Sequence, residues 1–235
     1  VMAGLLLSQR GIIQGMEYVN TLTDIKDKAE LNTLVEASKK QYKGTELKGR
    51  TLGVLGLGAI GSMVARMALQ MDMEVVGYDP ALSVDAAWRL PSQVQKMDSM
   101  QMLFSRADIV TLHVPALEST IGMINAERLS QMKPTGVIIN VARGRIIDED
   151  ALYDALSNRR IGGAILDTWY NYGADTWPCN RPFQDLDNVI LSAHRSAVTE
   201  EMHDRRWAFV ASQCARIGRD EAPLNVVFEG TRVTE

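Results

Sequence analysis

Residues 51–79, TLGVLGLGAIGSMVARMALQMDMEVVGYD, decide the expected fold of this 235-residue chain. The run 52–55 is short and apolar and is closed by glycine, as expected of a strand that is buried on both faces. A helical pattern follows over 59–71, and a second apolar run, 74–78, ends at Asp79. A strand, a glycine turn, a helix and a strand in this order predict a dinucleotide-binding βαβ unit.

Three glycines in the G-x-G-x-x-G spacing explain how this turn would hold a nucleotide. Gly56 permits the tight turn, Gly58 lets the backbone approach a pyrophosphate, and Gly61 lets the helix pack closely on the strand. The start of the helix, with Ala59 and Ile60, would present unpaired N–H groups to the phosphates. A plain glycine turn without a ligand is the alternative, but the flanking strand, helix and acid agree with a nucleotide site.

The acid at the end of the second strand predicts which dinucleotide binds. Asp79 lies where a carboxylate can accept hydrogen bonds from the ribose hydroxyls of the adenosine. Its charge would repel a 2′-phosphate, so NAD is expected rather than NADP. Because Pro80 follows, ordinary turn chemistry is the competing interpretation of this aspartate.

The rest of the chain alternates between apolar runs and helical patterns. Strands are expected at 108–114, 136–141, 163–167 and 188–192, and helices at 99–105, 125–132, 148–156 and 199–217. This alternation predicts an α/β fold, a doubly wound parallel sheet of the Rossmann type with flanking terminal helices. One helix is also expected over 2–19, and Met63, Met67 and Met71 are expected to pack in the core.

Composition argues against several kinds of partner and site. A formal net charge of -4 argues against a nucleic-acid partner. Cys179 and Cys214 are the only cysteines and have no metal-ligand spacing, so we expect no metal site and a reducing, cytoplasmic location. The apolar runs are shorter than a membrane span and no signal peptide is visible, so no membrane partner is expected.

Polar residues follow several of the predicted strands. In a doubly wound sheet, ligands bind at the carboxyl ends of the strands. The residues expected at this edge are Gly56, Gly58, Gly61, Asp79, Pro115, Arg143, Asp167 and His194. Their convergence is the main argument that the polar members act together.

Five motifs occur along nearly the whole chain: VLGLGAIG at 54–61, LHVP at 112–115, NVARGRIIDEDAL at 140–152, ILD at 165–167 and NVILSAH at 188–194. In this order and spacing they resemble the D-isomer-specific 2-hydroxyacid dehydrogenase family, most of all its phosphoglycerate dehydrogenase branch. The resemblance implies an NAD-dependent oxidoreductase. Such an enzyme transfers a hydride between nicotinamide and C2 of a D-2-hydroxy acid or its 2-keto acid, and 3-phosphoglycerate is one candidate substrate.

The resemblance also implies roles for individual residues. Arg143 would orient the substrate carboxylate and carbonyl, and His194 would be the catalytic acid or base. Both residues would also contact the cofactor. Asp167 would contact the nicotinamide carboxamide. The backbone at four further positions would line the cofactor: Val114, Pro115, Val141 and Ala142. Of the other histidines, His113 is expected to be structural within a strand, and His203 is expected to be solvated on the last helix.

The position of the family's glutamate is one departure from the family pattern. The family pairs its histidine with a glutamate shortly after the equivalent of Asp167, whereas this chain has Tyr172 at the matching spacing. A tyrosine can form hydrogen bonds but carries no charge near neutral pH. Trp169, Tyr170, Tyr172 and Trp177 form an aromatic cluster here, which is either a substrate wall or loop packing.

The resemblance further implies a domain organisation. Residues 1–20 are expected to be an interdomain or dimerisation helix, 21–197 the NAD-binding domain, and 198–235 a helix and tail that pack on a substrate domain. Most of that N-terminal substrate domain is expected to be missing from this chain, and a homodimer is expected. Two alternatives stay open: a non-catalytic NAD(H) sensor or corepressor-like module, and a truncated, inactive homologue.

Overall fold

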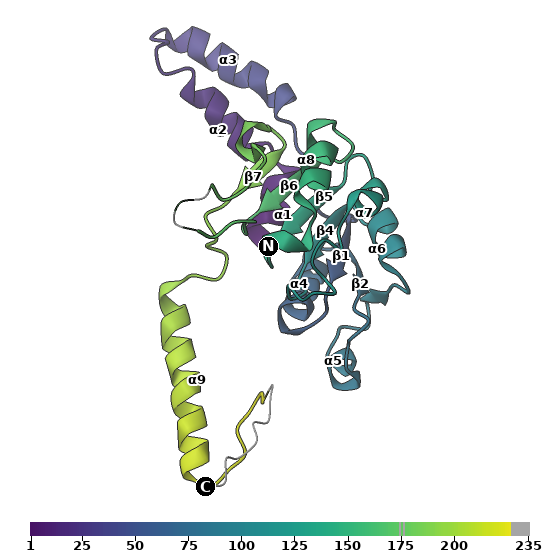
Figure 1. Ribbon diagram of the computed structural model, residues 1–235. Helices are drawn as coiled ribbons and strands as arrows, with labels where there is room; N and C mark the ends of the chain where they lie inside the picture. Colours follow the sequence, from purple (N-terminus) through teal and green to yellow (C-terminus); the bar gives the residue numbers. More distant parts are fainter. Residues whose placement is uncertain (174, 176, 227–235) are drawn as a thin grey trace. The chain divides into compact units, whose positions relative to one another are not determined.

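The structure, a computed structural model, describes residues 1–173, 175 and 177–226 (Figure 1). Among these residues, the compact unit Val1–His194 forms one seven-stranded, fully parallel sheet. Its strands are β1 (Thr51–Leu55), β2 (Glu74–Tyr78), β3 (Gln95–Lys96), β4 (Ile109–Leu112), β5 (Val137–Asn140), β6 (Gly163–Leu166) and β7 (Val189–Leu191). Their spatial order is β3-β2-β1-β4-β5-β6-β7, so the order reverses between β1 and β4. The doubly wound parallel sheet that the sequence predicts is confirmed.

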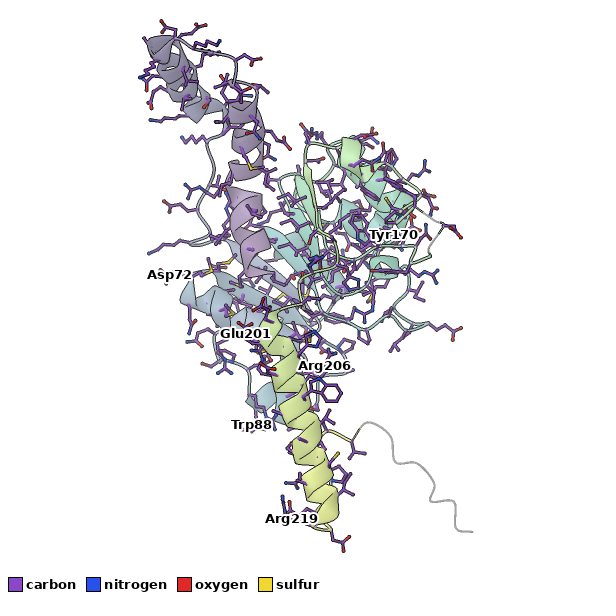
Figure 2. The ribbon with its side chains drawn as sticks, turned by 90° about the vertical axis from the view of Figure 1, so that its left-hand side faces the viewer. Asp72, Trp88, Tyr170, Glu201, Arg206 and Arg219 are labelled. Carbon is purple, nitrogen blue, oxygen red and sulfur yellow. The ribbon has the colours of Figure 1, made fainter. Side chains whose placement is uncertain are left out.

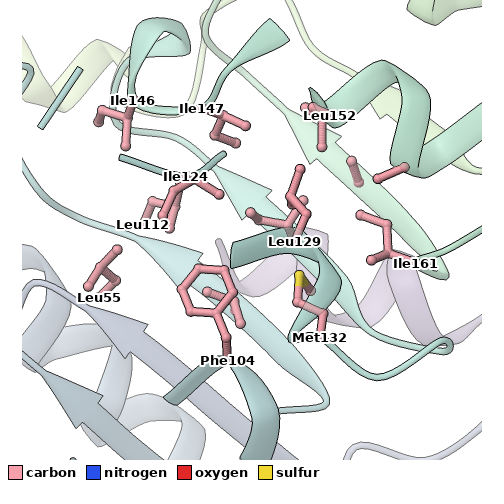
Figure 3. Packing of buried hydrophobic residues seen from close by; sticks show 14 of the residues in the cluster. Leu55, Phe104, Leu112, Ile124, Leu129, Met132, Ile146, Ile147, Leu152 and Ile161 are labelled. Atoms are coloured by element: carbon pink, nitrogen blue, oxygen red, sulfur yellow. The ribbon is translucent and has the colours of Figure 1, made fainter. Parts of the chain in front are cut away.

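Helices cover both faces of this sheet (Figure 1). One face is covered by α1 (Met2–Gln9) and α4 (Ala59–Gln70), and the other by α6 (Met100–Arg106), α7 (Ala126–Ser130) and α8 (Glu149–Ser157). Because successive strand residues point to opposite faces, Val54 packs with the first group of helices and Leu55 with the second. Figure 3 shows the second core, where Phe104 of α6 lies beside Leu55 and Leu112.

Helix α4 approaches the sheet through small residues. Gly61 and Ala65 are buried on its inner face, and a Cβ at Gly61 would overlap the carbonyl oxygen of Gly56. The larger side chains therefore point outward. The prediction of core positions is wrong for Met63 and Met67, which are 58% and 47% exposed, whereas Met71 packs at the edge of the core.

The N-terminal segment differs from the single helix that the sequence predicts. It forms α1 and then α2 (Ile12–Asn20), because Arg10 is extended and Gly11 begins the second helix as its N-cap. The backbone of Tyr42 packs so closely on Gly11 that a Cβ there would lie 3.1 Å from its carbonyl oxygen. The remaining elements of this unit are α3 (Lys28–Gln41), α5 (Val84–Trp88) and the 3-10 turns η1 (Gly144–Ile146) and η2 (Phe183–Asp185).

The second compact unit, Arg195–Glu235, is described as far as residue 226 and contains α9 (Glu200–Gly218). Thr199 caps this helix, since its hydroxyl accepts a hydrogen bond from the N–H of Met202 at 3.2 Å. Within α9 no residue is buried, and labelled side chains such as Glu201 and Arg206 project from it in Figure 2. In the described part of the chain, no helix is both long enough and apolar enough to cross a membrane.

Candidate functional site

The phosphate turn, residues 56–61, joins β1 to α4 in a conformation that needs glycine. Gly56 has φ +91°, and a Cβ there would lie 2.8 Å from the carbonyl carbon and oxygen of His113. Its N–H donates to the carbonyl of Tyr78 at 3.0 Å, and the N–H of His113 donates to the carbonyl of Leu55 at 2.8 Å. The end of β1 is thereby tied to the ends of both neighbouring strands.

The N-terminus of α4 fits an anionic ligand. Gly58 is its N-cap, and no side chain accepts a hydrogen bond from the first turn. A Cβ at Gly58 would meet nothing within 4 Å, so open space adjoins the backbone at this point. Unpaired N–H groups and the positive end of the helix dipole face this space, which is the arrangement that binds a pyrophosphate.

Asp79 lies at the end of β2, next to this turn. Its Oδ2 accepts from the N–H of Leu57 at 2.9 Å, and its Oδ1 accepts from the N–H of Ala81 at 3.0 Å. The turn contact expected from Pro80 is therefore present, and the same carboxylate is also held against the phosphate turn. Each carboxylate oxygen can accept a second hydrogen bond, which leaves acceptor capacity for ribose hydroxyls.

A hollow of about 490 Å³ gathers most of the remaining predicted cofactor residues. The start of α4 and the segments that follow β4 and β5 line it, with the residues Ile60, His113, Val114, Pro115, Ala116, Val141, Ala142 and Arg143. Six of these were singled out from the sequence as cofactor residues, so segments more than 50 residues apart meet as expected. Their contacts to a cofactor stay predictions.

Arg143 sits on a turn that a buried asparagine holds in place. The side chain of Asn140 is almost fully buried; its Oδ1 accepts from the N–H of Ala142 at 3.1 Å, and its Nδ2 donates to the carbonyl of Arg143 at 2.9 Å. The exposed guanidinium uses one donor to bind the carbonyl of Ala142 at 2.7 Å. Because a guanidinium carries five N–H donors, this side chain can still bind a carboxylate in a bidentate way.

His113 is a member of the hollow that the sequence interpretation missed. Strand β4 ends at Leu112, so this histidine follows the strand instead of lying within it. Its Nε2 is 3.0 Å from the hydroxyl of Thr111. Burial, with a smaller contribution from the amino group of Val1, lowers the pKa of His113 to about 4, which keeps the ring neutral at neutral pH. The sequence offered one signal that His113 lines this hollow: it directly precedes Val114 and Pro115, which were predicted to line the cofactor.

Asp167 follows β6, which pairs with β5, and His194 follows β7, which pairs with β6. Asp167 is 2% exposed; its Oδ1 accepts from the hydroxyl of Ser192 at 2.5 Å, and its N–H donates to the carbonyl of Asn140 at 3.0 Å. His194 is exposed and has φ +54°, in the left-handed region. Arg143, Asp167 and His194 thus occupy the carboxyl ends of three adjacent strands.

Tyr172 lies beside His194, where the family resemblance implies a glutamate. The two ring centroids are 5.5 Å apart and the ring planes are tilted by 53°. The other aromatic residues of this segment divide between exposure and packing. Trp177 is 67% exposed, whereas Tyr170, labelled in Figure 2, stacks on Phe183 with centroids 6.4 Å apart. Burial, reinforced by nearby acids, raises the pKa of the Tyr170 hydroxyl well above its ordinary value, so this residue is loop packing.

Comparison with known proteins agrees with this geometry. Residues 15–196 match the family described as D-isomer specific 2-hydroxyacid dehydrogenase, NAD binding domain. The chain belongs to the D-isomer specific 2-hydroxyacid dehydrogenase family. The NAD cofactor class that the glycine turn predicts is therefore confirmed at the level of the domain.

Relatives in this family act on several acids. The chain is 40% identical over 192 residues to the D-3-phosphoglycerate dehydrogenase of Methanocaldococcus jannaschii, covering 82% of this chain and 36% of that protein. It is 40% identical over 167 residues to the hydroxypyruvate reductase of Thermotoga maritima, covering 71% and 52%. The D-lactate dehydrogenase of Aquifex aeolicus, solved with NAD and lactic acid, superposes with a TM-score of 0.73 at 27% identity, covering 94% and 65%. The chain thus spans between a third and two thirds of these proteins.

Proposed function

We propose that this chain is the cofactor-binding part of an NAD-dependent dehydrogenase of D-2-hydroxy acids. One observation carries the proposal: Arg143, Asp167 and His194 follow the adjacent strands β5, β6 and β7, at the same edge of the sheet as the phosphate turn. When bound, the nicotinamide supplies or accepts the hydride at C2 of the substrate. The protein supplies binding, orientation and proton transfer.

Each residue of the site has a task that matches its chemistry. The N-terminus of α4 binds the pyrophosphate and Asp79 binds the adenosine ribose, which favours NAD over NADP. Arg143 binds the substrate carboxylate with its planar fork. His194 gives a proton to the carbonyl oxygen during reduction and takes the hydroxyl proton during oxidation. Asp167, fixed by Ser192, accepts a hydrogen bond from the carboxamide.

3-Phosphoglycerate is our first candidate substrate, because the D-3-phosphoglycerate dehydrogenase of the methanogen matches four fifths of this chain at 40% identity. A non-catalytic NAD(H) sensor is the second candidate function. The presence of Tyr172 beside His194, where the family resemblance implies a carboxylate, favours it.

The outer surfaces of the helices support a larger assembly. Apolar side chains are exposed along α2 and α4, namely Ile12, Met16, Val19, Met63 and Met67. We propose that a second copy of the chain covers them in a homodimer. On α9, the exposed Trp207, Phe209 and Ile217 support packing of residues 198–235 on a substrate domain, with 1–20 as the connecting helical segment and 21–197 as the cofactor domain. The sparse cysteines support a cytoplasmic location.

A titration with NADH tests the cofactor part of this proposal. Energy transfer from tryptophan to bound NADH should saturate, and NADPH should bind at least about tenfold more weakly, because the Asp79 charge opposes a 2′-phosphate. NADH oxidation is then followed in the protein that includes the substrate domain, with the 2-keto acids of 3-phosphoglycerate, glycerate and lactate. His194→Asn should abolish turnover and keep NADH affinity. Saturable NADH binding without turnover of any acid would favour the sensor instead.

A further inference from the structure

The contact between Tyr172 and His194 joins two segments that follow different strands. Tyr172 comes from the loop after β6, and His194 follows β7. Besides its ring contact at 5.5 Å, Tyr172 uses its hydroxyl: the oxygen accepts a hydrogen bond from the N–H of Trp169 at 2.8 Å. The ring is therefore held at its far end, although the side chain is 61% exposed.

The loop that carries Tyr172 is anchored on both sides. The N–H groups of Tyr170 and Asn171 both donate to the carbonyl of Pro178, at 3.1 and 2.9 Å. Further along, the carboxylate of Glu149 accepts from the side-chain amide of Asn180 at 2.7 Å and from the N–H of Arg181 at 3.0 Å. These contacts fix the backbone on both sides of an exposed tyrosine. A functional site that depends on a defined side-chain position requires such support.

The same loop also touches the turn that bears Arg143. A Cβ at Gly144 would overlap the carbonyl oxygen of Trp169, so the two backbones are in direct contact. The backbone of Trp169 therefore makes two contacts. Its carbonyl oxygen touches the turn that bears Arg143, and its N–H donates to the hydroxyl of Tyr172. His194, in turn, has a left-handed φ of +54°.

We propose that Tyr172 is a positioning residue for His194, and that ring packing here replaces the carboxylate of the family pattern. The tyrosine ring limits the orientations of the imidazole by packing against it, and the hydrogen bond from Trp169 adds a smaller restraint on that ring. Arg143 and His194 then keep their relative positions through one loop. This inference rests on the proposed dehydrogenase function.

Nuclear magnetic resonance of the histidine ring protons tests the contact without any assay of activity. The ring current of Tyr172 should displace the His194 signals, which His194→Asn assigns by their disappearance. Tyr172→Phe keeps the ring and should keep most of the displacement, whereas Tyr172→Ala should remove it. Unchanged His194 signals in Tyr172→Ala, from a protein with unaltered NADH affinity, would overturn the inference.

Turnover, measured in the protein that includes the substrate domain, separates positioning from mere packing. Tyr172→Ala should lower kcat by about tenfold, less than the roughly 10²–10⁴-fold that the acid or base itself contributes, with NADH affinity unchanged. Tyr172→Phe should restore kcat to within about threefold of the wild type, because the packing ring remains. Equal kcat in wild type and Tyr172→Ala would overturn the positioning role. A displaced His194 signal in a wild type without turnover would instead overturn the dehydrogenase proposal.

Discussion

The phosphate turn and the loop around Tyr172 lie at the same edge of one sheet, yet they are built in opposite ways. The turn occupies six consecutive residues, and what matters at Gly56, Gly58 and Gly61 is the lack of a side chain. The loop depends on side chains whose partners are far away in sequence, such as Tyr172 on His194. A binding site formed by the backbone can therefore be predicted from local residue spacing. A site formed by side chains exists only when segments that follow different strands come together.

The largest effect that should distinguish the two regions is expected at Gly61. A Cβ there would overlap the backbone oxygen of Gly56, which no rotamer change can relieve. Gly61→Ala should therefore lower the free energy of unfolding by about 3 kcal/mol or more and abolish NADH binding. Urea denaturation followed by circular dichroism measures the first effect, and the NADH titration measures the second.

Gly58→Ala is the matched control for that substitution. Its Cβ meets nothing within 4 Å, so the free energy of unfolding should change by less than about 1 kcal/mol. NADH affinity should still fall by roughly tenfold, since the methyl group enters the space next to the phosphates. If Gly58→Ala binds NADH as well as the wild type, the turn does not hold the pyrophosphate.

The loop around Tyr172 should also respond to an added Cβ. At Gly144, a Cβ would overlap the carbonyl oxygen of Trp169, so Gly144→Ala should lower the free energy of unfolding by about 2 kcal/mol. It should also move Trp169 and with it Tyr172, so the His194 ring signals should shift toward those of Tyr172→Ala. Loss of stability with unchanged His194 signals would show that the loop packs without positioning the histidine.

A smaller effect, on the order of 1–3 kcal/mol, is expected from the titration of His113. Its pKa is lowered to about 4 in the folded protein, from about 6.5 when unfolded, so the unfolded chain binds more protons between these values. The stability that the neutral ring contributes is complete above pH 6.5 and is lost as the pH falls through 4. Urea unfolding between pH 4 and 7.5 should show this loss, and His113→Gln should flatten that part of the curve.

Much of the fold could be predicted because its signals are local. Two capping side chains lie at the predicted helix starts. Asn125 accepts a hydrogen bond from the N–H of Arg128 at 3.0 Å, and Asp148 accepts one from the N–H of Ala151 at 2.8 Å. Strand β3 was missed because it is two exposed residues, Gln95 and Lys96, at the sheet edge. The prediction from apolar periodicity turned the methionine face of α4 toward the core. The structure instead buries the small residues Gly61, Ala65 and Ala68, because the helix packs closely on the sheet.

The sequence by itself determined the class of fold, the cofactor class and the strand ends that carry polar residues, because spacing, glycine and apolar runs act within a few residues of each other. Only the tertiary structure decided that His113 lines the hollow and that Tyr172 packs on His194. Whether these residues meet depends on the spatial order of the seven strands in the described sheet. Side-chain chemistry at a site is thus set by strand order, which no local pattern encodes.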